Sequence, residues 1–284
     1  EGEIFGLLGP NGSGKTTAIN CILALLKYDK GSIRIFGKEM EPDNYEAKRQ
    51  IGIVQQNVAV FDEFTVYENI DYFCGLYIND RKKRKQLVEE AIAFVGLEDY
   101  RKIRPKKLSG GLLRRLNIAC GIAHKPRLII LDEPTVAVDP QSRNRILEGI
   151  QQLNRQGSTI IYTSHYMEEV EQICTRIAIM DHGRSIASGT KEQLTGMIKT
   201  GEKVTVEAVV LKEEQLVQIR ELSHVFKVDY ENDILRVQCT EAKHNLVRIL
   251  RYLEDQEISF GRVYSELPTL NDVFLEITGK ELRD

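Results

Sequence analysis

The sequence lacks several features that would assign it to a particular class of protein. No apolar run approaches the ~18 residues that span a bilayer, and no signal peptide is visible, so any membrane span that its function requires is expected from another polypeptide. The formal net charge is only −3, which gives no general attraction to nucleic acid, and we expect no nucleic-acid partner. The cysteines are widely spaced without a C-x-x-C pair, which indicates buried cytosolic thiols rather than a disulfide or zinc framework: Cys21, Cys74, Cys120, Cys174 and Cys239.

What the chain does contain is enough apolar sequence for a sizeable core. It has 284 residues, of which 42% are hydrophobic and 29% charged, with no low-complexity tract and no internal repeat. A chain of this size forms one large domain, or a large domain with a small one beside it.

Strand and helix patterns alternate over the first two thirds of the chain. The strand patterns are continuous apolar runs rather than alternating ones, as in strands that are buried on both faces. The sequence therefore predicts an α/β fold with a mostly parallel core sheet. Strands are predicted at 3–9, 31–37, 49–56, 127–134 and 158–166, with a strand and hairpin at 175–184; helices are predicted at 16–26, 64–78, 83–97, 112–124 and 140–157. Because the first strand leads directly into a glycine-rich loop, we expect further strands of the sheet upstream of Glu1.

The pattern changes near residue 200. The remaining segments read β-α-β-β-α-β with a short final helix, which is the ferredoxin-like plan of a small α+β domain. Two glycines and polar residues at 195–203 mark the junction. We predict a nucleotide-binding domain at 1–198 and an accessory domain at 199–284.

GPNGSGKTT (9–17) matches the phosphate-loop pattern G-x-x-x-x-G-K-[ST] between a predicted strand and a predicted helix. Its glycines let backbone N–H groups surround a polyphosphate, and the helix N-terminus adds its positive end. Lys15 can reach the β- and γ-phosphates, and the Thr16 hydroxyl can ligate Mg²⁺. The residues assigned to the nucleotide are Asn11, Gly12, Ser13, Gly14, Lys15, Thr16 and Thr17.

Acidic and polar residues follow three other predicted strands. Asp132 emerges at the end of the apolar run LIILD, where a hard Mg²⁺ prefers oxygen ligands, and Glu133 is placed to polarise a water for attack on the γ-phosphate. A solvated acidic turn is the alternative. His165 follows the strand at 158–166, at the edge where ligands gather in open α/β sheets, although single histidines are commonly structural. Gln56 or Gln55, after the strand at 49–56, could ligate Mg²⁺ or position water.

LSGG (108–111) is a second glycine turn before a helix. Backbone amides there form an anion-binding nest with Ser109 as an additional donor. Since the phosphate loop already holds the chain's own phosphates, this turn implies a second nucleotide or a partner's nucleotide. A plain helix N-cap is the alternative.

These pieces, in this order, resemble the nucleotide-binding subunits of ATP-binding cassette (ABC) transporters over about residues 1 to 195. The corresponding family motifs are the Walker A motif (GPNGSGKTT), the Walker B motif (LIILDE), the ABC signature (LSGG), the H-switch (TSH), the Q-loop glutamine at Gln56 and the D-loop (TVAVD, 135–139).

The resemblance implies an ATPase whose two cassettes pack head to tail as a homodimer. Each ATP would lie, with Mg²⁺, between one Walker A motif and the other subunit's signature. Ser109, Gly110 and Gly111 would contact the γ-phosphate of the partner's ATP, and Asp139 would shape the shared interface.

The same resemblance implies roles in hydrolysis. Glu133 would be the catalytic base and His165 the γ-phosphate sensor, with Lys15 at the phosphates. Mg²⁺ would be held by Thr16, Asp132 and Gln56, and the loop around Gln56 would connect the ion to the transporter contact.

The C-terminal half is similar to bacterial drug- and antibiotic-exporter subunits of the daunorubicin-resistance type. This implies a separate integral-membrane permease of the ABC-2 class and a peripheral position on the cytoplasmic face of the cell membrane. Related cassettes serve the export of sodium, other ions or lipid-type substrates. The basic run RKKRK (81–85) contacts lipid headgroups or a permease, or is a solvated helix face.

The sequence departs from the family pattern at three points, of which the first two favour a different hypothesis, a regulatory module with little turnover. Leu112 stands where the signature usually continues with glutamine, Val136 is bulkier than the usual D-loop residue, and no residue can be assigned as the adenine-stacking aromatic, which the family places upstream of the Walker A motif. Cassettes that act on ribosomes or DNA ends carry a second cassette or a long coiled coil, and neither is present here. A guanine-nucleotide switch would require an N-K-x-D motif, which is also missing.

Overall fold

The computed structural model describes residues 1–207 and 209–279. It divides into two compact units, Glu1–Ser188 and the residues from Gly189 onward. Each unit has its own sheet, and each is described separately below.

The first unit is built on a six-stranded sheet with the strand order β4-β5-β6-β1-β7-β8. The neighbouring pairs from β4 to β7 are parallel, which confirms the predicted mostly parallel core. Strand β5 is buried along its whole length and β1 at four of its five residues, as expected of strands covered on both faces. The strands are β1 (Ile4–Leu8), β4 (Ile51–Val54), β5 (Leu128–Asp132), β6 (Thr159–Ser164), β7 (Arg176–Asp181) and β8 (Arg184–Gly189).

Helices α2 to α6 of the first unit begin at residues whose side chains cap them. Thr65 and Glu68 form a capping box at the start of α3, and Asp80 caps α4 by accepting a hydrogen bond from the Lys83 N–H. Gly96 ends α4 in the left-handed conformation. The helices are α1 (Lys15–Ile22), α2 (Tyr45–Lys48), α3 (Val66–Gly75), α4 (Arg81–Val95), α5 (Gly110–Ile122), α6 (Pro140–Arg155) and α7 (Met167–Ile173), with 3₁₀ turns at Glu98–Tyr100 and Pro105–Lys107.

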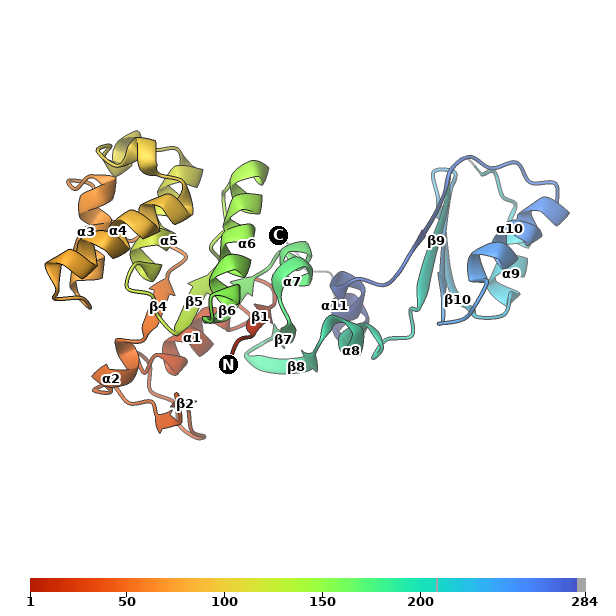
Figure 1. Ribbon diagram of the computed structural model, residues 1–284. Helices are drawn as coiled ribbons and strands as arrows, with labels where there is room; N and C mark the ends of the chain where they lie inside the picture. Colours follow the sequence, from red (N-terminus) through yellow and green to blue (C-terminus); the bar gives the residue numbers. More distant parts are fainter. Residues whose placement is uncertain (208, 280–284) are drawn as a thin grey trace. The chain divides into compact units, whose positions relative to one another are not determined.

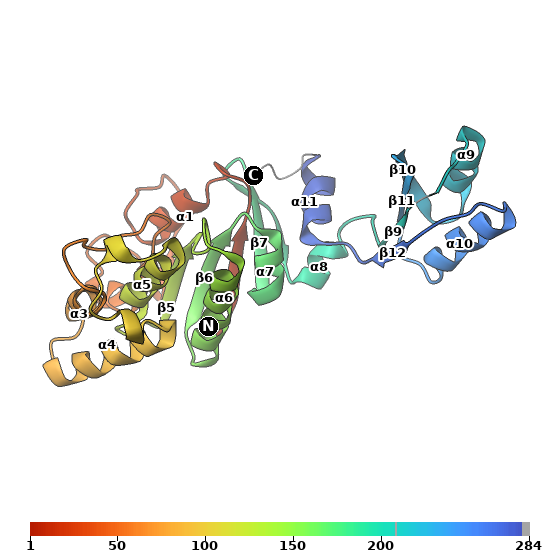
Figure 2. The same ribbon diagram turned by 90° about the horizontal axis from the view of Figure 1, so that it is seen from above.

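Three of these helices form the predicted helical subdomain. Helices α3, α4 and α5 pack on one another, and α5 also packs on the edge strand β4. Both ribbon views show the three helices grouped at one end of the unit (Figures 1 and 2). Four residues of the basic run at the start of α4 are exposed, while Arg84 pairs with Asp71 of α3 at 2.8 Å.

Two sequence predictions are wrong in detail. The strand expected at 31–37 is a two-residue strand, β2 (Arg34–Ile35), that pairs only with β3 (Lys38–Glu39), because Phe36 and Gly37 both have positive φ and reverse the chain in a tight hairpin turn. The helix expected at 16–26 ends at Ile22, because Ala24 has a φ of 52° that does not fit a right-handed helix.

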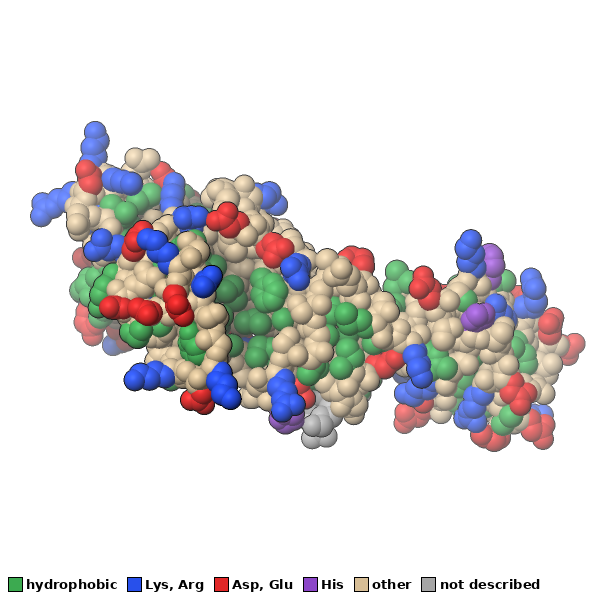
Figure 3. Space-filling model, turned by 90° about the horizontal axis from the view of Figure 1, so that it is seen from below, with side chains coloured by type: hydrophobic (Ala, Val, Ile, Leu, Met, Phe, Trp, Pro, Cys, Tyr) green, Lys and Arg blue, Asp and Glu red, His purple; other side chains and the backbone are tan. Residues whose placement is uncertain are grey.

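The β2–β3 hairpin leaves part of the sheet accessible. Ile35 of the hairpin is buried with α1, α2 and strand residues in one apolar cluster. Beside it, a groove of about 480 Å³ is lined by the hairpin, Ile22 and the sheet residues Leu128 and Ile161. On the face drawn in Figure 3, hydrophobic side chains gather in a hollow of the first unit.

The second unit has the predicted ferredoxin-like order. Its sheet runs β10-β11-β9-β12 and every neighbouring pair is antiparallel. Helices α9 and α10 cover the same face and supply Leu216, Ile219, Ile249 and Leu253 to the core (Figure 1). The elements are β9 (Glu202–Glu207), α9 (Glu213–Glu221), β10 (Val225–Glu231), β11 (Ile234–Cys239), α10 (Asn245–Asp255) and β12 (Val263–Glu266).

Two more helices belong to the second unit. Helices α8 (Lys191–Thr195) and α11 (Leu270–Thr278) pack against each other. The unit therefore begins at Gly189, upstream of the predicted domain junction at 198/199.

The five cysteines are all free thiols. Cys74, Cys120 and Cys239 are buried, whereas Cys21 and Cys174 are partly exposed, so the expectation of burial is wrong for these two. In the described ranges no helix combines the length and the apolar character needed to cross a membrane.

Candidate functional site

The glycine-rich loop connects the end of β1 to the N-terminus of α1. Gly14 is the N-cap of α1 and has a φ of 103°, a conformation that a side chain would strain. At Gly9 a Cβ would lie 2.4 Å from the Met180 carbonyl oxygen, so only glycine lets the loop pass β7 this closely. Asn11 and Gly12 at the tip are exposed, and the Ser13 N–H donates to the Pro10 carbonyl at 3.1 Å. The loop can therefore present several N–H groups to one anion.

Lys15 is buried at the first position of α1, with 5% of its surface exposed. Its Nζ donates to the carbonyls of Gly9 at 2.8 Å and Pro10 at 3.2 Å, and lies 3.2 Å from Oε1 of Glu133. The ammonium group is thus held inside the loop, beside a carboxylate from another strand.

Thr16 and Asp132 form the next contact of the site. The Thr16 hydroxyl donates to Oδ2 of Asp132 at 2.9 Å, and Oδ1 of Asp132 accepts from the Thr163 hydroxyl at 2.6 Å. The described residues contain no cluster of three or more His, Cys, Asp or Glu that would cage a metal. One carboxylate and one hydroxyl instead suit a hard divalent cation that takes its remaining ligands from phosphates and water.

Glu133 is the point at which distant parts of the sequence meet. Its Oε2 accepts from Nε2 of Gln56 at 3.0 Å and lies 3.4 Å from Nδ1 of His165, while Oε1 faces Lys15. The backbone of Glu133 has a φ of 48°, and its N–H donates to the Thr163 hydroxyl at 2.9 Å. A non-glycine residue in this conformation is held there by its surroundings, as is common at functional sites.

The choice between the two glutamines is decided by where their groups lie. The Gln56 side chain reaches Glu133, whereas Gln55 contributes its backbone carbonyl, which accepts from Arg114 and Asn117. Gln56 is therefore the glutamine at the site.

The signature turn caps its helix and lies beside α6. Oγ of Ser109 accepts from the Leu112 N–H at 3.4 Å, so the N-cap given above as the alternative interpretation of this turn is present. At Gly111 a Cβ would lie 2.6 Å from Oγ of Ser142 and 3.1 Å from Oδ2 of Asp139. Asp139 caps α6 by accepting from the Ser142 N–H at 2.9 Å, and this bond lowers the pKa of the Asp139 carboxyl.

The turn is not joined to the phosphate loop of its own chain. Within the described residues, no hydrogen bond or ion pair connects Ser109, Gly110 or Gly111 with residues 9–17. Ser109 and Gly110 are exposed. The structure thus groups Lys15, Thr16, Asp132, Glu133, Gln56 and His165 in one place and leaves the signature turn and Asp139 in another.

Sequence reasoning missed Arg114, which is 4% exposed. Its guanidinium donates to the carbonyls of Gln55 at 3.1 Å, Gln56 at 2.7 Å and Glu133 at 2.6 Å, and so ties the Gln56 loop to the end of β5. Burial lowers the pKa of Arg114, although Asp132 and Glu133 act in the opposite direction. The available signal was a basic residue on the apolar face of α5, since a buried cation needs partners.

Thr163 was also missed, although its hydroxyl contacts both Asp132 and Glu133. It lies within an apolar strand pattern, where a threonine is an ordinary β-strand residue. The sequence around it carried no signal of this role.

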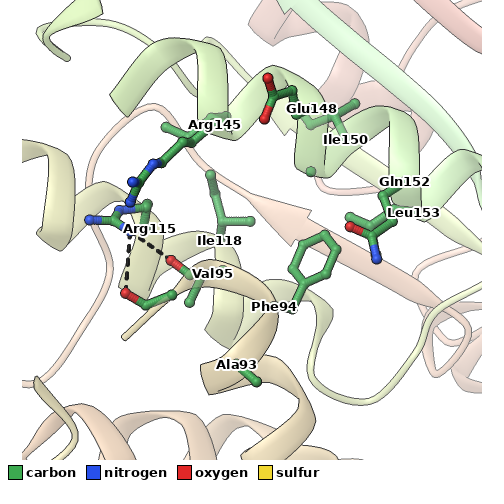
Figure 4. Close-up of a pocket in the computed structure, with 13 residues that line it drawn as sticks. Ala93, Phe94, Val95, Arg115, Ile118, Arg145, Glu148, Ile150, Gln152 and Leu153 are labelled. Atoms are coloured by element: carbon green, nitrogen blue, oxygen red, sulfur yellow. Dashed lines mark hydrogen bonds between the residues drawn. The ribbon is translucent and has the colours of Figure 1, made fainter. Parts of the chain in front are cut away.

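A separate cavity of about 230 Å³ lies between α4, α5 and α6 and is lined by none of the predicted site residues (Figure 4). Arg115 extends across one end and donates to the carbonyls of Val95, at 2.8 Å, and Gly96, at 3.3 Å. Phe94 reaches the same cavity from α4 and lies against Gly149 of α6. The hydrogen-bonding role of Arg115 is thus to pair the last carbonyls of α4, and the residue is not assigned to a nucleotide.

Comparisons with known proteins agree with the two-unit division. Residues 1–136 match the ABC transporter family, and residues 196–278 match the C-terminal domain of DrrA1-3-like ATP-binding proteins. The linearmycin resistance ATP-binding protein LnrL of Bacillus subtilis is 41% identical over 286 residues, covering 100% of this chain and 92% of the relative. The daunorubicin resistance ATP-binding protein DrrA3 of Streptomyces coeruleorubidus is 31% identical, covering 100% of this chain and 89% of the relative.

A solved structure is also similar to the first unit. An ATP-binding cassette determined as a dimer in a post-hydrolysis state, bound to ADP and Pi, superimposes with a TM-score of 0.61 at 27% identity. The match covers 67% of this chain and 86% of the other. This identity and this TM-score indicate that the matched part of the chain has the same overall cassette fold as the solved structure.

Proposed function

Because this chain belongs to the ATP-binding subunits of ABC transporters, an ATPase family, we propose that its hydrolysis of ATP drives export of a drug, antibiotic or other small substrate through a separate membrane permease. The observation that carries the proposal is the convergence of Lys15, Gln56 and His165 on the Glu133 carboxylate. Two relatives named for resistance to linearmycin and daunorubicin support an exported antibiotic as cargo.

The phosphate loop binds the ATP polyphosphate. Backbone N–H groups of residues 11–17 surround the β- and γ-phosphates, and Lys15 exchanges its present carbonyl and Glu133 contacts for phosphate oxygens. That exchange frees Oε1 of Glu133.

Mg²⁺ would be held by Thr16, Asp132 and Gln56. The first two already place their oxygens 2.9 Å apart, and Gln56 gives its amide N–H to Glu133, which leaves its carbonyl oxygen for the cation. When bound, the ion neutralises charge on the phosphate oxygens. Thr163 keeps the Asp132 carboxylate directed toward Thr16 through its 2.6 Å hydrogen bond.

Glu133 acts as general base and takes a proton from the attacking water at its carboxylate. Gln56 and His165 both face Oε2, so they orient this oxygen, and their contacts with it depend on whether it carries the proton. His165 in addition senses the γ-phosphate. Arg114 fixes the backbone on both sides of the pair formed by Gln56 and Glu133.

The shared ATP site requires a second copy of the chain. In the signature turn, Ser109 and Gly110 are exposed, lie apart from their own phosphate loop and are available to the partner's ATP. Asp139 lies beside it and so belongs to the same interface. The similar cassette solved as a dimer supports this head-to-tail homodimer.

The membrane part of the transporter is a permease of the ABC-2 class, and the cassette sits on it at the cytoplasmic face of the membrane. The match of residues 196–278 to DrrA-like C-terminal domains supports this class. A low-turnover regulatory module is the second candidate, favoured by Leu112 in the signature turn. Stimulation of ATP hydrolysis by the co-purified permease would favour the motor over the module.

The decisive experiment combines two substitutions. Glu133→Gln removes the base and keeps the hydrogen bond of Gln56, so the variant should hydrolyse ATP at least 100-fold more slowly and accumulate as an ATP-bound dimer in gel filtration. Adding Ser109→Arg should abolish that dimer, because the side chain would enter the partner's phosphate site. Normal turnover in the single variant would exclude Glu133 as the base. A persisting dimer in the double variant would exclude the shared site.

A further inference from the structure

Behind the nucleotide site lies a buried carboxylate that the proposed mechanism does not use. Glu169, on α7, is 3% exposed. Its Oε2 accepts three hydroxyl hydrogen bonds, from Thr135 at 2.7 Å, Tyr162 at 2.6 Å and Ser164 at 3.1 Å. A buried carboxylate with this many donors is fixed in place, because losing any donor leaves charge uncompensated.

The hydroxyl donors connect this carboxylate with both sides of the catalytic centre. Thr135 is two residues after Glu133, and Ser164 directly precedes His165. The Ser164 hydroxyl also accepts from the Tyr166 N–H at 2.9 Å, which shapes the turn that carries His165. One carboxylate oxygen thus links the segment of the base to the segment of the sensor.

The second carboxylate oxygen faces a third element. Oε1 of Glu169 lies 3.3 Å from Nε of Arg143, in the first turn of α6. The Arg143 N–H donates to the Asp139 carbonyl at 2.9 Å, and its guanidinium lies 4.9 Å from the centre of the Tyr166 ring. Glu169 is therefore connected to the helix that begins beside the signature turn.

Tyr162, one of the donors to this carboxylate, is itself fully buried. Burial and the neighbouring Glu169 raise the pKa of Tyr162 well above its ordinary value, so the phenol remains a donor to Oε2. Its hydroxyl also lies 3.4 Å from Oγ1 of Thr135. The three hydroxyl donors and Arg143 together offset the cost of burying the charge.

From this geometry we propose that Glu169 is a positioning residue for ATP hydrolysis: it holds the Glu133 and His165 segments at a fixed separation and ties both to the N-terminus of α6. The inference rests on the proposed roles of Glu133 and His165. A change in the position of α6 at the dimer interface is transmitted through Arg143 and Glu169 to the two segments that carry the base and the sensor.

The test compares Glu169→Gln with Glu168→Gln, its exposed neighbour on α7. The amide of the first variant keeps the shape of the side chain, but it loses the charge and directs an NH₂ group at either Arg143 or the hydroxyl donors. We expect kcat for ATP hydrolysis to fall about 10- to 100-fold, because small displacements of catalytic groups have effects of this size. The KM for ATP should change less than about twofold, since the phosphate loop is untouched. Glu168→Gln should match the wild type.

Two hydroxyl substitutions test the same link if Glu169→Gln does not fold. Thr135→Val and Ser164→Ala each remove one donor, and we expect each to lower kcat without changing the KM for ATP. The fold-reduction of kcat in the double variant should be smaller than the product of the two single fold-reductions, because both hydroxyls act through one carboxylate. Strictly multiplicative effects would overturn the proposal.

The outcomes also separate this inference from the proposed function. If Glu133→Gln is inactive while Glu169→Gln has a kcat within twofold of the wild type, only the positioning role is wrong. If Glu133→Gln hydrolyses ATP normally, the proposed base is wrong. An equal loss of kcat in Glu168→Gln would show that the effect comes from α7 in general.

Discussion

Replacing Arg114 by methionine tests how much of the site depends on one buried cation. The substitution keeps an unbranched side chain of similar length on α5 but removes three hydrogen bonds to the carbonyls of Gln55, Gln56 and Glu133. Those carbonyls lie just beyond the ends of the paired strands β4 and β5, and the guanidinium is their common partner there.

The expected loss of stability in Arg114→Met follows from the number of hydrogen bonds removed and from the burial of the guanidinium. A hydrogen bond that involves a charged group contributes roughly 1.5–3 kcal/mol, so three bonds contribute roughly 4.5–9 kcal/mol. Desolvation of the guanidinium, which lowers the pKa of Arg114, offsets part of that sum. Removing one partner of a buried charged pair lowers the free energy of unfolding by about 3–5 kcal/mol, and we expect a loss of about 4 kcal/mol for Arg114→Met. For a unit of this size, that lowers the Tm by about 8–16 °C.

The assay is thermal unfolding without nucleotide, followed by circular dichroism, together with ATP hydrolysis at a temperature where the variant is folded. Arg155→Met is the matched control, because Arg155 is an exposed arginine at the end of α6. We expect the control to unfold within about 2 °C of the wild type, and Arg114→Met to hydrolyse ATP more slowly even when folded. A Tm for Arg114→Met equal to that of the control would refute the reasoning.

Two further predictions concern the packing of α5 and its end. Gly52→Ala would place a Cβ 2.4 Å from the Gly121 carbonyl oxygen and 2.6 Å from Cγ of Pro126, so we expect a destabilisation of about 1–3 kcal/mol in urea unfolding; an unchanged urea midpoint would show that α5 can move away from β4 at little cost. Burial lowers the pKa of His124 to about 4, from an ordinary value near 6.5, and its Nε2 faces the Ile51 carbonyl. The unfolded chain binds the proton more tightly, so His124 contributes stability that is present above pH 6.5 and lost as the pH falls toward 4, by on the order of 3 kcal/mol. His124→Phe should flatten this pH dependence of the urea midpoint, and an unchanged slope between pH 6.5 and 4 would mean that other groups cause it.

Most of the fold could be predicted from local patterns. Continuous apolar runs marked the buried strands, the phosphate-loop pattern marked the turn before α1, and the β-α-β-β-α-β order marked the second unit, because each pattern lies within one segment. The misplaced strand at 31–37 shows the limit of this reasoning. Its composition favours a strand, but the two positive φ values at Phe36 and Gly37 turn the chain back after two residues.

The candidate site was predictable to the extent that its residues lie in recognisable motifs. Lys15, Asp132, Glu133 and His165 each follow a buried strand or a glycine turn, and parallel strands bring such ends to one edge. The Gln55/Gln56 alternative could not be resolved in this way, because adjacent residues in a loop differ only in which side chain turns toward the site.

The sequence by itself determined the fold class, the phosphate loop and most of the candidates for the groups that bind and hydrolyse nucleotide, because these are properties of short segments. Only the tertiary structure decided how the groups are connected. Arg114 and Glu169 lie within ordinary helix patterns, and their importance comes from partners 19 to 59 residues away for the first and up to 34 residues away for the second. A buried charge acquires its role from the groups that surround it, and those are brought together only by the folding of the whole unit.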